Sequence, residues 1–342
     1  MRDQDLRTFW CVWIKATFQM RNDRRSLFVA DQDPVRQAPL FIDGDPDKVL
    51  VADTDVSLPR AQVDVILDAV GRAPGGDASR MFNCVAEIGD WRKSVDVSPP
   101  SVWSRRGKPE PVRDVVAEPV RLDYANAFGG AEVENNPVGV GYYADMAAAE
   151  GKALPRLAPP DRRPRRPDRI EPPAAFSAIP RQWPARERLG GTYDEQWSRR
   201  RSPLLPADLD PEYWQSAPED QRISRDAIAD RILLTNMVPE DESGPDGRFT
   251  GTIPRLGFEV ATRFDGRWVQ GEMALQSIFI AADTRRLSLT YMATHEIGAT
   301  QNDVLVDRTF VALRSHEGFL VRGEDAACFD PARDKQQVKE VA

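Results

Sequence analysis

Histidine and cysteine are scarce in this chain, and long apolar runs are missing. Only two of the 342 residues are histidines, His295 and His316, and the three cysteines, Cys11, Cys84 and Cys328, lie far apart. This spacing contains no Cys-x-x-Cys motif and no pattern of zinc ligands, so the sequence predicts no metal site and favours a reducing compartment. No stretch approaches the ~20 apolar residues that a membrane-spanning helix needs.

An excess of positive charge is also missing. The net charge is −8, whereas a general nucleic-acid binder needs a positive surface to displace the counterions of phosphates. The average hides an asymmetry, because residues 156–201 contain twelve arginines and six acidic residues. The apolar run at residues 9–14 stops at Lys15 and is too short for the core of a signal peptide. We therefore expect a cytoplasmic protein with no cofactor, and with neither nucleic acid nor membrane among its partners.

Alternation of apolar and polar residues predicts β-strands in the first third of the chain. Residues 9–20 are rich in aromatic and β-branched side chains, and residues 26–30 are their predicted hairpin partner. Residues 63–70 and 81–88 flank a turn-prone stretch of Pro, Gly and Asp, which predicts a second hairpin that residues 91–97 continue. Short strands at this spacing indicate a sandwich or an open barrel.

The last third of the chain also shows strand patterns. Residues 258–264 alternate between apolar and polar side chains, and an Asp-Gly pair supplies a tight turn before residues 267–270 return. Residues 275–281 and 287–291 are predicted to pair in the same way, and residues 303–313 to form a further strand.

Proline, glycine and aromatic residues are concentrated between these two β sections. Thirteen of the 28 prolines lie between residues 155 and 218, and prolines and glycines exclude a long helix or a central strand. Two short helices are predicted, one at residues 142–150 before Gly151 and one from a capping box of Ser216 and Glu219. The aromatic residues argue against disorder, so we expect an ordered, irregular segment.

We therefore predict a mainly β fold. It has two antiparallel β-sandwich or open-barrel-like sections, bridged by a long ordered segment that is rich in Pro, Gly and aromatic residues and carries a few short helices. The predicted boundaries are residues 1–122 for the N-terminal β section, 123–225 for the connecting segment, 226–330 for the C-terminal β section and 331–342 for a charged tail. Whether the two β sections share one core stays open.

Several short blocks of residues, which follow one another along the connecting segment, together resemble the sequence pattern of a known bacterial family. These blocks are Ala127, Phe128, Gly129 and Gly130; Asn136, Pro137, Gly139 and Gly141; Trp183 and Arg186; Gly191, Thr192, Tyr193, Asp194 and Trp197; Pro203, Pro206 and Asp208; and Ala217, Pro218, Asp220 and Gln221. The pattern is similar to domain of unknown function family 2169, which is encoded beside the VgrG spike protein of type VI secretion systems. The resemblance extends to residues 15–18 and 283–284, but residues 225–227 depart from the family's Gly-Asp-Glu step.

The resemblance implies a non-catalytic adaptor, or chaperone. Such a protein binds a type VI effector in the cytoplasm and helps to load it onto the VgrG- or PAAR-type spike. The predicted partner-binding residues are Phe128, Trp183, Arg186, Tyr193, Asp194, Trp197, Arg162, Arg163, Arg165 and Arg166. The residues predicted to shape the segment are Gly129, Gly130, Asn136, Pro137, Gly139, Gly141, Gly191, Thr192, Pro203 and Asp208.

Two carboxylates in the segment allow an enzymatic alternative. Asp194 and Asp208 lie near aromatic residues, as in a carboxylate-dependent hydrolase of the glycosidase type. No second feature marks an acid–base pair, however, and carboxylates in turns commonly accept hydrogen bonds from the backbone. The glycines at positions 139 and 141 also lack the Gly-Lys-Ser/Thr continuation of a phosphate-binding loop, so turn geometry explains them better.

The arginines and the large aromatic residues each have two interpretations. The run of arginines at residues 162–166 forms either a solvated, proline-stiffened loop or a binding surface. As a surface it favours an acidic protein partner over nucleic acid, because the rest of the chain is negative. Five aromatic residues either pin the irregular segment onto the β sections or anchor a partner, since Trp, Tyr and Arg dominate interface hot spots: Trp183, Tyr193, Trp197, Tyr213 and Trp214.

Overall fold

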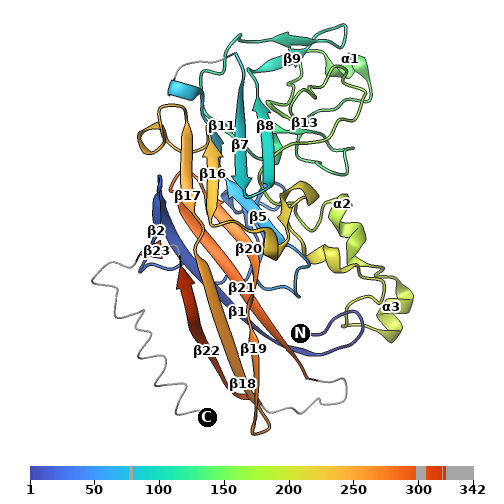
Figure 1. The fold of residues 1–342 in the computed structure, drawn as a ribbon. Helices are drawn as coiled ribbons and strands as arrows, with labels where there is room; N and C mark the ends of the chain where they lie inside the picture. The colour runs from blue at the N-terminus through green and yellow to red at the C-terminus, as the bar shows by residue number, and fades with distance from the viewer. Residues whose placement is uncertain (77–79, 298–305, 318, 321–342) are drawn as a thin grey trace.

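A seven-stranded sheet contains strands from both ends of the chain. The computed structural model describes residues 1–76, 80–297, 306–317 and 319–320 (Figure 1). In spatial order the strands of this sheet are β15 (Arg222–Ile223), β5 (Val63–Asp68), β20 (Ala274–Ala281), β21 (Arg286–Glu296), β1 (Phe9–Arg21), β2 (Arg24–Phe28) and β23 (Phe319–Leu320). The β5–β20 and β2–β23 pairs are parallel and the others antiparallel.

Two further sheets extend the molecule in opposite directions, one in the upper and one in the lower part of Figure 1. The upper sheet has the order β14 (Leu157–Ala158), β8 (Trp91–Val97), β7 (Phe82–Ile88), β16 (Arg231–Thr235) and β17 (Arg248–Thr252). The lower sheet has the order β19 (Arg267–Glu272), β18 (Arg255–Phe264) and β22 (Val306–Glu317). Both sheets again combine strands that are distant in the sequence.

Short strand pairs and single turns of helix make up the rest. The pairs are β3 (Leu40–Phe41) with β4 (Leu50–Ala52), β6 (Val70–Gly71) with β11 (Val120–Arg121), β9 (Ser101–Trp103) with β10 (Pro109–Pro111), and β12 (Phe128–Gly129) with β13 (Val140–Gly141). The α-helices are α1 (Met146–Ala149), α2 (Pro184–Glu187) and α3 (Glu195–Arg200). The 3-10 turns are Ile42–Gly44, Pro74–Gly76, Tyr124–Asn126, Arg188–Gly190, Pro211–Trp214, Glu219–Gln221, Arg225–Ala227 and Glu240–Glu242.

One large hydrophobic core contains residues of both β sections and of the connecting segment. Its buried members include Phe18 on β1, Ile232 on β16 and Leu289 on β21, together with Phe176 and Trp183 of the connecting segment. The three predicted stretches of sequence therefore share one core, which answers the question that the sequence left open. The mainly β prediction is confirmed.

Hairpins with short turns are found where the sequence predicts them. β1 pairs with β2, β7 with β8, β18 with β19 and β20 with β21, all in antiparallel fashion. The predicted strand at residues 303–313 corresponds to β22, although its first three residues, like the charged tail and Cys328, lie outside the described residues.

The predicted hairpin between residues 63–70 and 81–88 is wrong. β5 lies between β15 and β20 instead, and β7 pairs with β8 and β16. The burial of β5 explains this, because its first five residues are all buried and such a strand needs neighbours on both edges and covers on both faces.

The predicted capping box is also wrong. The 3-10 turn at Glu219–Gln221 begins after Pro218, and the Ser216 hydroxyl donates instead to Asp64 Oδ2 at 2.9 Å. The other predicted helix is shorter than expected. It spans α1 alone and is followed by Gly151 with φ of 73°.

Candidate partner-binding surface

A buried ion pair fixes the connecting segment onto the β sections. Arg186 lies on α2, which begins with a proline directly after Trp183. Its Nη2 lies 2.7 Å from Asp53 Oδ2, and both side chains are 3% exposed. The same guanidinium donates to the carbonyl oxygens of Ile179 at 2.6 Å and Tyr213 at 2.9 Å. One arginine therefore joins three stretches of the chain.

The charge of Asp53 is stabilised by its surroundings. Burial alone would raise the pKa of this carboxyl, but the positive charges of Arg186 and Arg181 and the hydrogen bond from Arg186 outweigh burial. The pKa of Asp53 is therefore held below its ordinary value, and the group stays ionised inside the protein.

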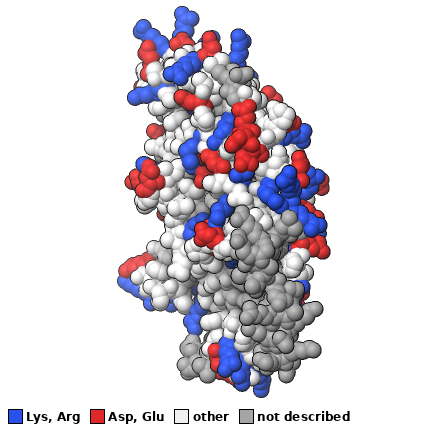
Figure 2. Space-filling model, turned by 90° about the vertical axis from the view of Figure 1, so that its left-hand side faces the viewer, with Lys and Arg blue, Asp and Glu red and all other residues white. Residues whose placement is uncertain are grey.

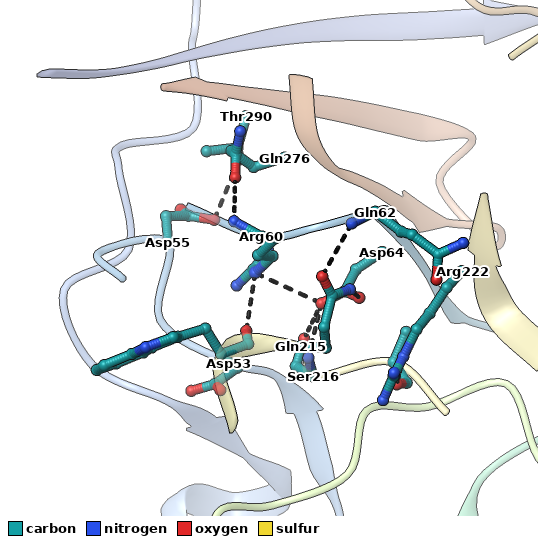
Figure 3. A network of polar contacts seen from close by, with 12 residues as sticks. Asp53, Asp55, Arg60, Gln62, Asp64, Gln215, Ser216, Arg222, Gln276 and Thr290 are labelled. Atoms are coloured by element: carbon teal, nitrogen blue, oxygen red, sulfur yellow. Dashed lines mark hydrogen bonds and ion pairs between the residues drawn. The ribbon is translucent and has the colours of Figure 1, made fainter. Parts of the chain in front are cut away.

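A second buried carboxylate, Asp64 on β5, binds the end of the segment (Figure 3). Asp64 accepts hydrogen bonds from Gln215 Nε2 and the backbone N–H of Ser216, both at 2.7 Å. Arg60 lies beside it, with Nε 3.5 Å from Asp64 Oδ2 and 3.0 Å from the carbonyl oxygen of Trp214. These contacts hold residues 214–216 against the edge of the large sheet.

A third attachment joins buried Lys93 and Gln221 with Asp220, whose side chain is 63% exposed. Lys93 Nζ on β8 lies 2.8 Å from Asp220 Oδ1 and 2.7 Å from Gln221 Oε1. Gln221 Nε2 donates in turn to the carbonyl oxygens of Val65 at 2.7 Å and Phe176 at 3.0 Å. Two of the blocks that resemble the family, Trp183 with Arg186 and Ala217 to Gln221, thus lie at contacts between the connecting segment and the β sections.

The glycine-rich blocks surround one buried side chain, Asn136. Its Nδ2 donates to the carbonyl oxygens of Tyr124 at 2.8 Å and Phe128 at 2.9 Å. A Cβ added at Gly129 would lie 2.2 Å from the carbonyl oxygen of Asn136, and one added at Gly139 would lie 2.2 Å from Nδ2. Close packing thus requires both glycines. Gly130, Pro137 and Gly141 complete this turn, and Gly141 adopts a φ of 110° that favours glycine.

Three of the predicted partner-binding side chains lie in the interior. Phe128 is 1% exposed and Trp183 is 3% exposed, with the Trp183 ring packed edge-to-face on Tyr124 at a centroid distance of 5.2 Å. Arg186 is the buried partner of Asp53. These three side chains pin the segment, and their burial leaves none of them available at the surface.

The stretch at residues 191–209, which we name the α3 hook, projects beside the β sheets (Figure 1). Its two ends are tied together, because Asp208 accepts hydrogen bonds from the backbone N–H of Thr192 at 3.0 Å and from its hydroxyl at 2.7 Å. Asp194 caps α3 by accepting from the backbone N–H of Trp197 at 2.7 Å. Trp197 Nε1 donates to the carbonyl oxygen of Leu204 at 2.8 Å. These bonds order the hook internally.

The α3 hook presents aromatic and basic side chains to solvent. Tyr193 is 58% exposed, and its ring packs edge-to-face on Trp197 at a centroid distance of 4.7 Å. Arg199 on α3 has a side chain that is 73% exposed and pairs with Glu195, one turn earlier in the same helix. Pro203, which follows a cis peptide bond, lies exposed on the hook, and Gly191 begins it with φ of 82°.

Asp194 and Asp208 both accept hydrogen bonds from backbone N–H groups of the hook. Hydrogen bonds from the backbone and hydroxyl of Thr192 lower the pKa of Asp208. Because each carboxylate is bound by the loop that carries it, the geometry supports the structural interpretation of these two residues and gives no sign of an acid–base pair in this part of the described chain.

The arginine-rich stretch is ordered by its prolines. Pro164 and Pro167 are buried, whereas Arg162, Arg165 and their neighbours Arg163 and Arg166 are exposed. Arg163 still bonds to the Ser98 hydroxyl, and Arg166 pairs with Asp168 at 2.5 Å. The stretch is therefore a loop whose backbone is held in place and whose arginines are exposed.

Sequence reasoning missed the buried carboxylates Asp53 and Asp64. One signal was present for Asp64, since it interrupts an otherwise apolar run on β5 and an unpaired charge inside a strand is costly. For Asp53 no local signal exists, because its partner Arg186 lies 133 positions further along the chain.

The histidines and the two cysteines that the structure describes take no part in the hydrogen bonds and ion pairs given above for the connecting segment. His295 is buried, and burial lowers its pKa, whereas His316 is exposed. Cys84 is buried and Cys11 is half-buried. Within the described ranges no group of three or more His, Cys, Asp or Glu residues is arranged to hold a metal ion. Likewise, no helix in the described part of the chain is long and apolar enough to cross a membrane.

A comparison with protein-family models agrees with the family resemblance seen in the sequence of the connecting segment. The family model described as "Uncharacterized protein conserved in bacteria (DUF2169)" matches residues 5–292. The chain belongs to this family. No curated protein and no solved structure gives a significant match. The matched range of DUF2169 includes the buried attachments, the glycine-rich turn and the α3 hook, and its last residue lies in β21.

Proposed function

We propose that this DUF2169 protein is a non-catalytic adaptor, or chaperone, for a type VI secretion effector. In this function it binds the effector in the cytoplasm and helps to load it onto the VgrG- or PAAR-type spike. Support comes from membership of the family together with the residues that resemble its adaptor members.

The observation that carries the proposal is the construction of the α3 hook. An exposed tyrosine and exposed arginines stand on a loop whose ends are bonded to each other through Thr192 and Asp208. Tyr, Trp and Arg are the residues that dominate protein interfaces. A loop that is already ordered loses little conformational entropy on binding, so it suits a protein-binding surface.

Ion pairs on either side of the hook hold its two ends in place. Arg186 with Asp53 and Lys93 with Asp220 hold the segments on either side of it against the sheets. A partner that binds the hook therefore binds the whole β body. Binding only the folded, loading-competent form of an effector would stabilise that form by mass action, and this requires no chemistry from the adaptor.

Co-expression with the neighbouring effector, followed by affinity capture and a secretion assay, tests this proposal. The effector is expected to be captured, and to be soluble and secreted only when the adaptor is present. An effector that is equally soluble and equally secreted without the adaptor contradicts the proposal.

A further inference from the structure

Two basic loops meet at one end of the molecule, far from α3 in Figure 1. The first, residues 104–108, is the turn between β9 and β10, and the second is residues 161–169. A Cβ added at Gly107 would lie 3.3 Å from Pro167 Cδ. The backbone N–H of Tyr143 also donates to the carbonyl oxygen of Pro167 at 2.9 Å, which fixes the second loop in place.

Positive charge is concentrated in these two loops. They contain eight basic and two acidic residues, a net charge of +6 in a chain of net charge −8. A shallow hollow of about 410 Å³ is lined by the nearby Glu171 and by residues of the second loop, which are Asp161, Arg162, Arg163, Arg165 and Arg169. On the face shown in Figure 2, by contrast, acidic and basic side chains are interspersed.

Much of this charge is left without a carboxylate partner. Arg166 pairs with Asp168 and Arg169 with Glu171. Within the residues that the structure describes, no Asp or Glu forms an ion pair with the six remaining exposed cations, of which Arg163 bonds to the Ser98 hydroxyl and the others are Arg105, Arg106, Lys108, Arg162 and Arg165.

Both loops are ordered before any partner binds. In the first loop the backbone N–H of Gly107 donates to the carbonyl oxygen of Ser104 at 2.8 Å, and that of Lys108 donates to the Ser104 hydroxyl at 3.1 Å. In the second, Pro164 and Pro167 are buried. The guanidinium groups therefore extend from fixed backbones, which reduces the entropy lost when they pair.

We propose that these two loops form a docking surface for an acidic peptide segment of a protein partner. Arg105, Arg106, Arg162 and Arg165 pair with Asp and Glu carboxylates of that segment, since the guanidinium fork matches a carboxylate in two parallel hydrogen bonds. The inference depends on the proposed function for the existence of a protein partner. It adds a second contact, separate from the α3 hook.

Charge complementarity favours an acidic peptide over nucleic acid. A nucleic-acid strand carries one charge on every phosphate, so it needs a continuous positive surface to displace its counterions. Asp161, Asp168 and Glu171 interrupt the basic surface. A peptide that mixes acidic and neutral residues tolerates such interruptions.

Binding of a short fluorescent peptide of Glu, Asp and Gly to the full chain tests this surface. The comparison includes its Gln/Asn counterpart and an oligothymidine strand, at low and physiological salt. The test variant is R105Q/R106Q/R162Q/R165Q, and the matched control is R24Q/R25Q/R188Q/R267Q, which removes four exposed arginines elsewhere.

The acidic peptide is expected to bind the wild-type chain and the control variant alike. The test variant is expected to bind it about tenfold more weakly, because each exposed ion pair contributes only a few-fold. Failure of the acidic peptide to bind at low salt, equal weakening in the control, or tighter binding of oligothymidine overturns the inference. This probe needs no effector, so its failure is distinguishable from failure of the adaptor proposal.

Discussion

Asp53 shows how much of this structure depends on single buried charges. It accepts hydrogen bonds from Arg186 at 2.7 Å and Arg181 at 3.3 Å, and from the backbone N–H of Thr54 at 2.7 Å. A buried ion pair contributes little net stability over a well-packed apolar pair, but the loss of one partner strands the other charge in a medium of low dielectric constant.

Replacing Asp53 with Asn is expected to lower the free energy of unfolding by about 3–5 kcal/mol, because Arg186 is left buried and uncompensated. Urea denaturation measures the effect. Asp43→Asn is the control, since Asp43 pairs with Lys48 at the surface and its loss is expected to leave the unfolding midpoint unchanged. Equal shifts in the two variants would show that the buried pair has no special role.

Asp53 and a second carboxylate, Asp33, which accepts hydrogen bonds from Arg286 and Ser288, predict a loss of stability in acid. Burial raises the pKa of Asp33 and Asp53, but ion pairs and hydrogen bonds lower it more, so both folded-state values lie below those of the unfolded chain. The unfolded state therefore binds more protons as the pH falls below about 4. The stability that these groups contribute is present above that pH and is lost as the pH falls through the folded values.

Urea unfolding midpoints measured between pH 7 and pH 3 are expected to fall most steeply below about pH 4. Asp53→Asn removes one of the carboxylates whose pKa is lowered in the folded state, so the stability of this variant is expected to depend less on pH in that range. A variant that keeps the full acid dependence of the wild-type chain would contradict this assignment.

At the scale of elements, the glycine-rich turn depends on close packing around Asn136. Gly139→Ala is expected to destabilise the protein by roughly 3 kcal/mol, because the added Cβ would meet Asn136 Nδ2 at 2.2 Å and the carbonyl oxygen of Ala127 at 2.7 Å. Thermal unfolding checks this. Gly44→Ala is the control, since Gly44 has φ of 71° with no atom within 4 Å of its Cβ position, and only backbone strain of about 1 kcal/mol is expected. If both variants unfold alike, packing is not what requires Gly139.

Elements with local partners could be predicted from the sequence, and those with distant partners could not. β1 and β2 or β18 and β19 are joined by short turns, so the pairing follows from the pattern alone. β5 lies beside β20, more than 200 residues later in the chain, and no local pattern specifies that neighbour.

The candidate site could be predicted only in outline. Trp183 and Tyr193 both fit a partner-binding pattern in the sequence, yet Trp183 lies in the core and Tyr193 on the exposed hook. Which of them is buried depends on ion pairs across the fold, such as that between Arg186 and Asp53, and sequence spacing does not contain this information.

At the scale of the whole molecule, three sheets and the connecting segment share one core, and the α3 hook and the basic loops extend from it at separate places (Figure 1). This arrangement suits an adaptor that holds one partner at two points, since two linked contacts raise the effective concentration of each other. The proposed function therefore depends on exposed side chains on a rigid body.

The affinity for the effector that we propose as its partner, measured by calorimetry for the full chain and for its Tyr193→Ala variant, tests this account most directly. Leu40→Ala is the matched control, because Leu40 is also an exposed apolar residue, at 47% against 58% for Tyr193. Tyr193→Ala is expected to weaken binding by about thirtyfold, the effect of a hot spot of about 2 kcal/mol, with unchanged unfolding free energy. Effector binding by Tyr193→Ala that equals that of the wild-type chain and of Leu40→Ala would contradict it.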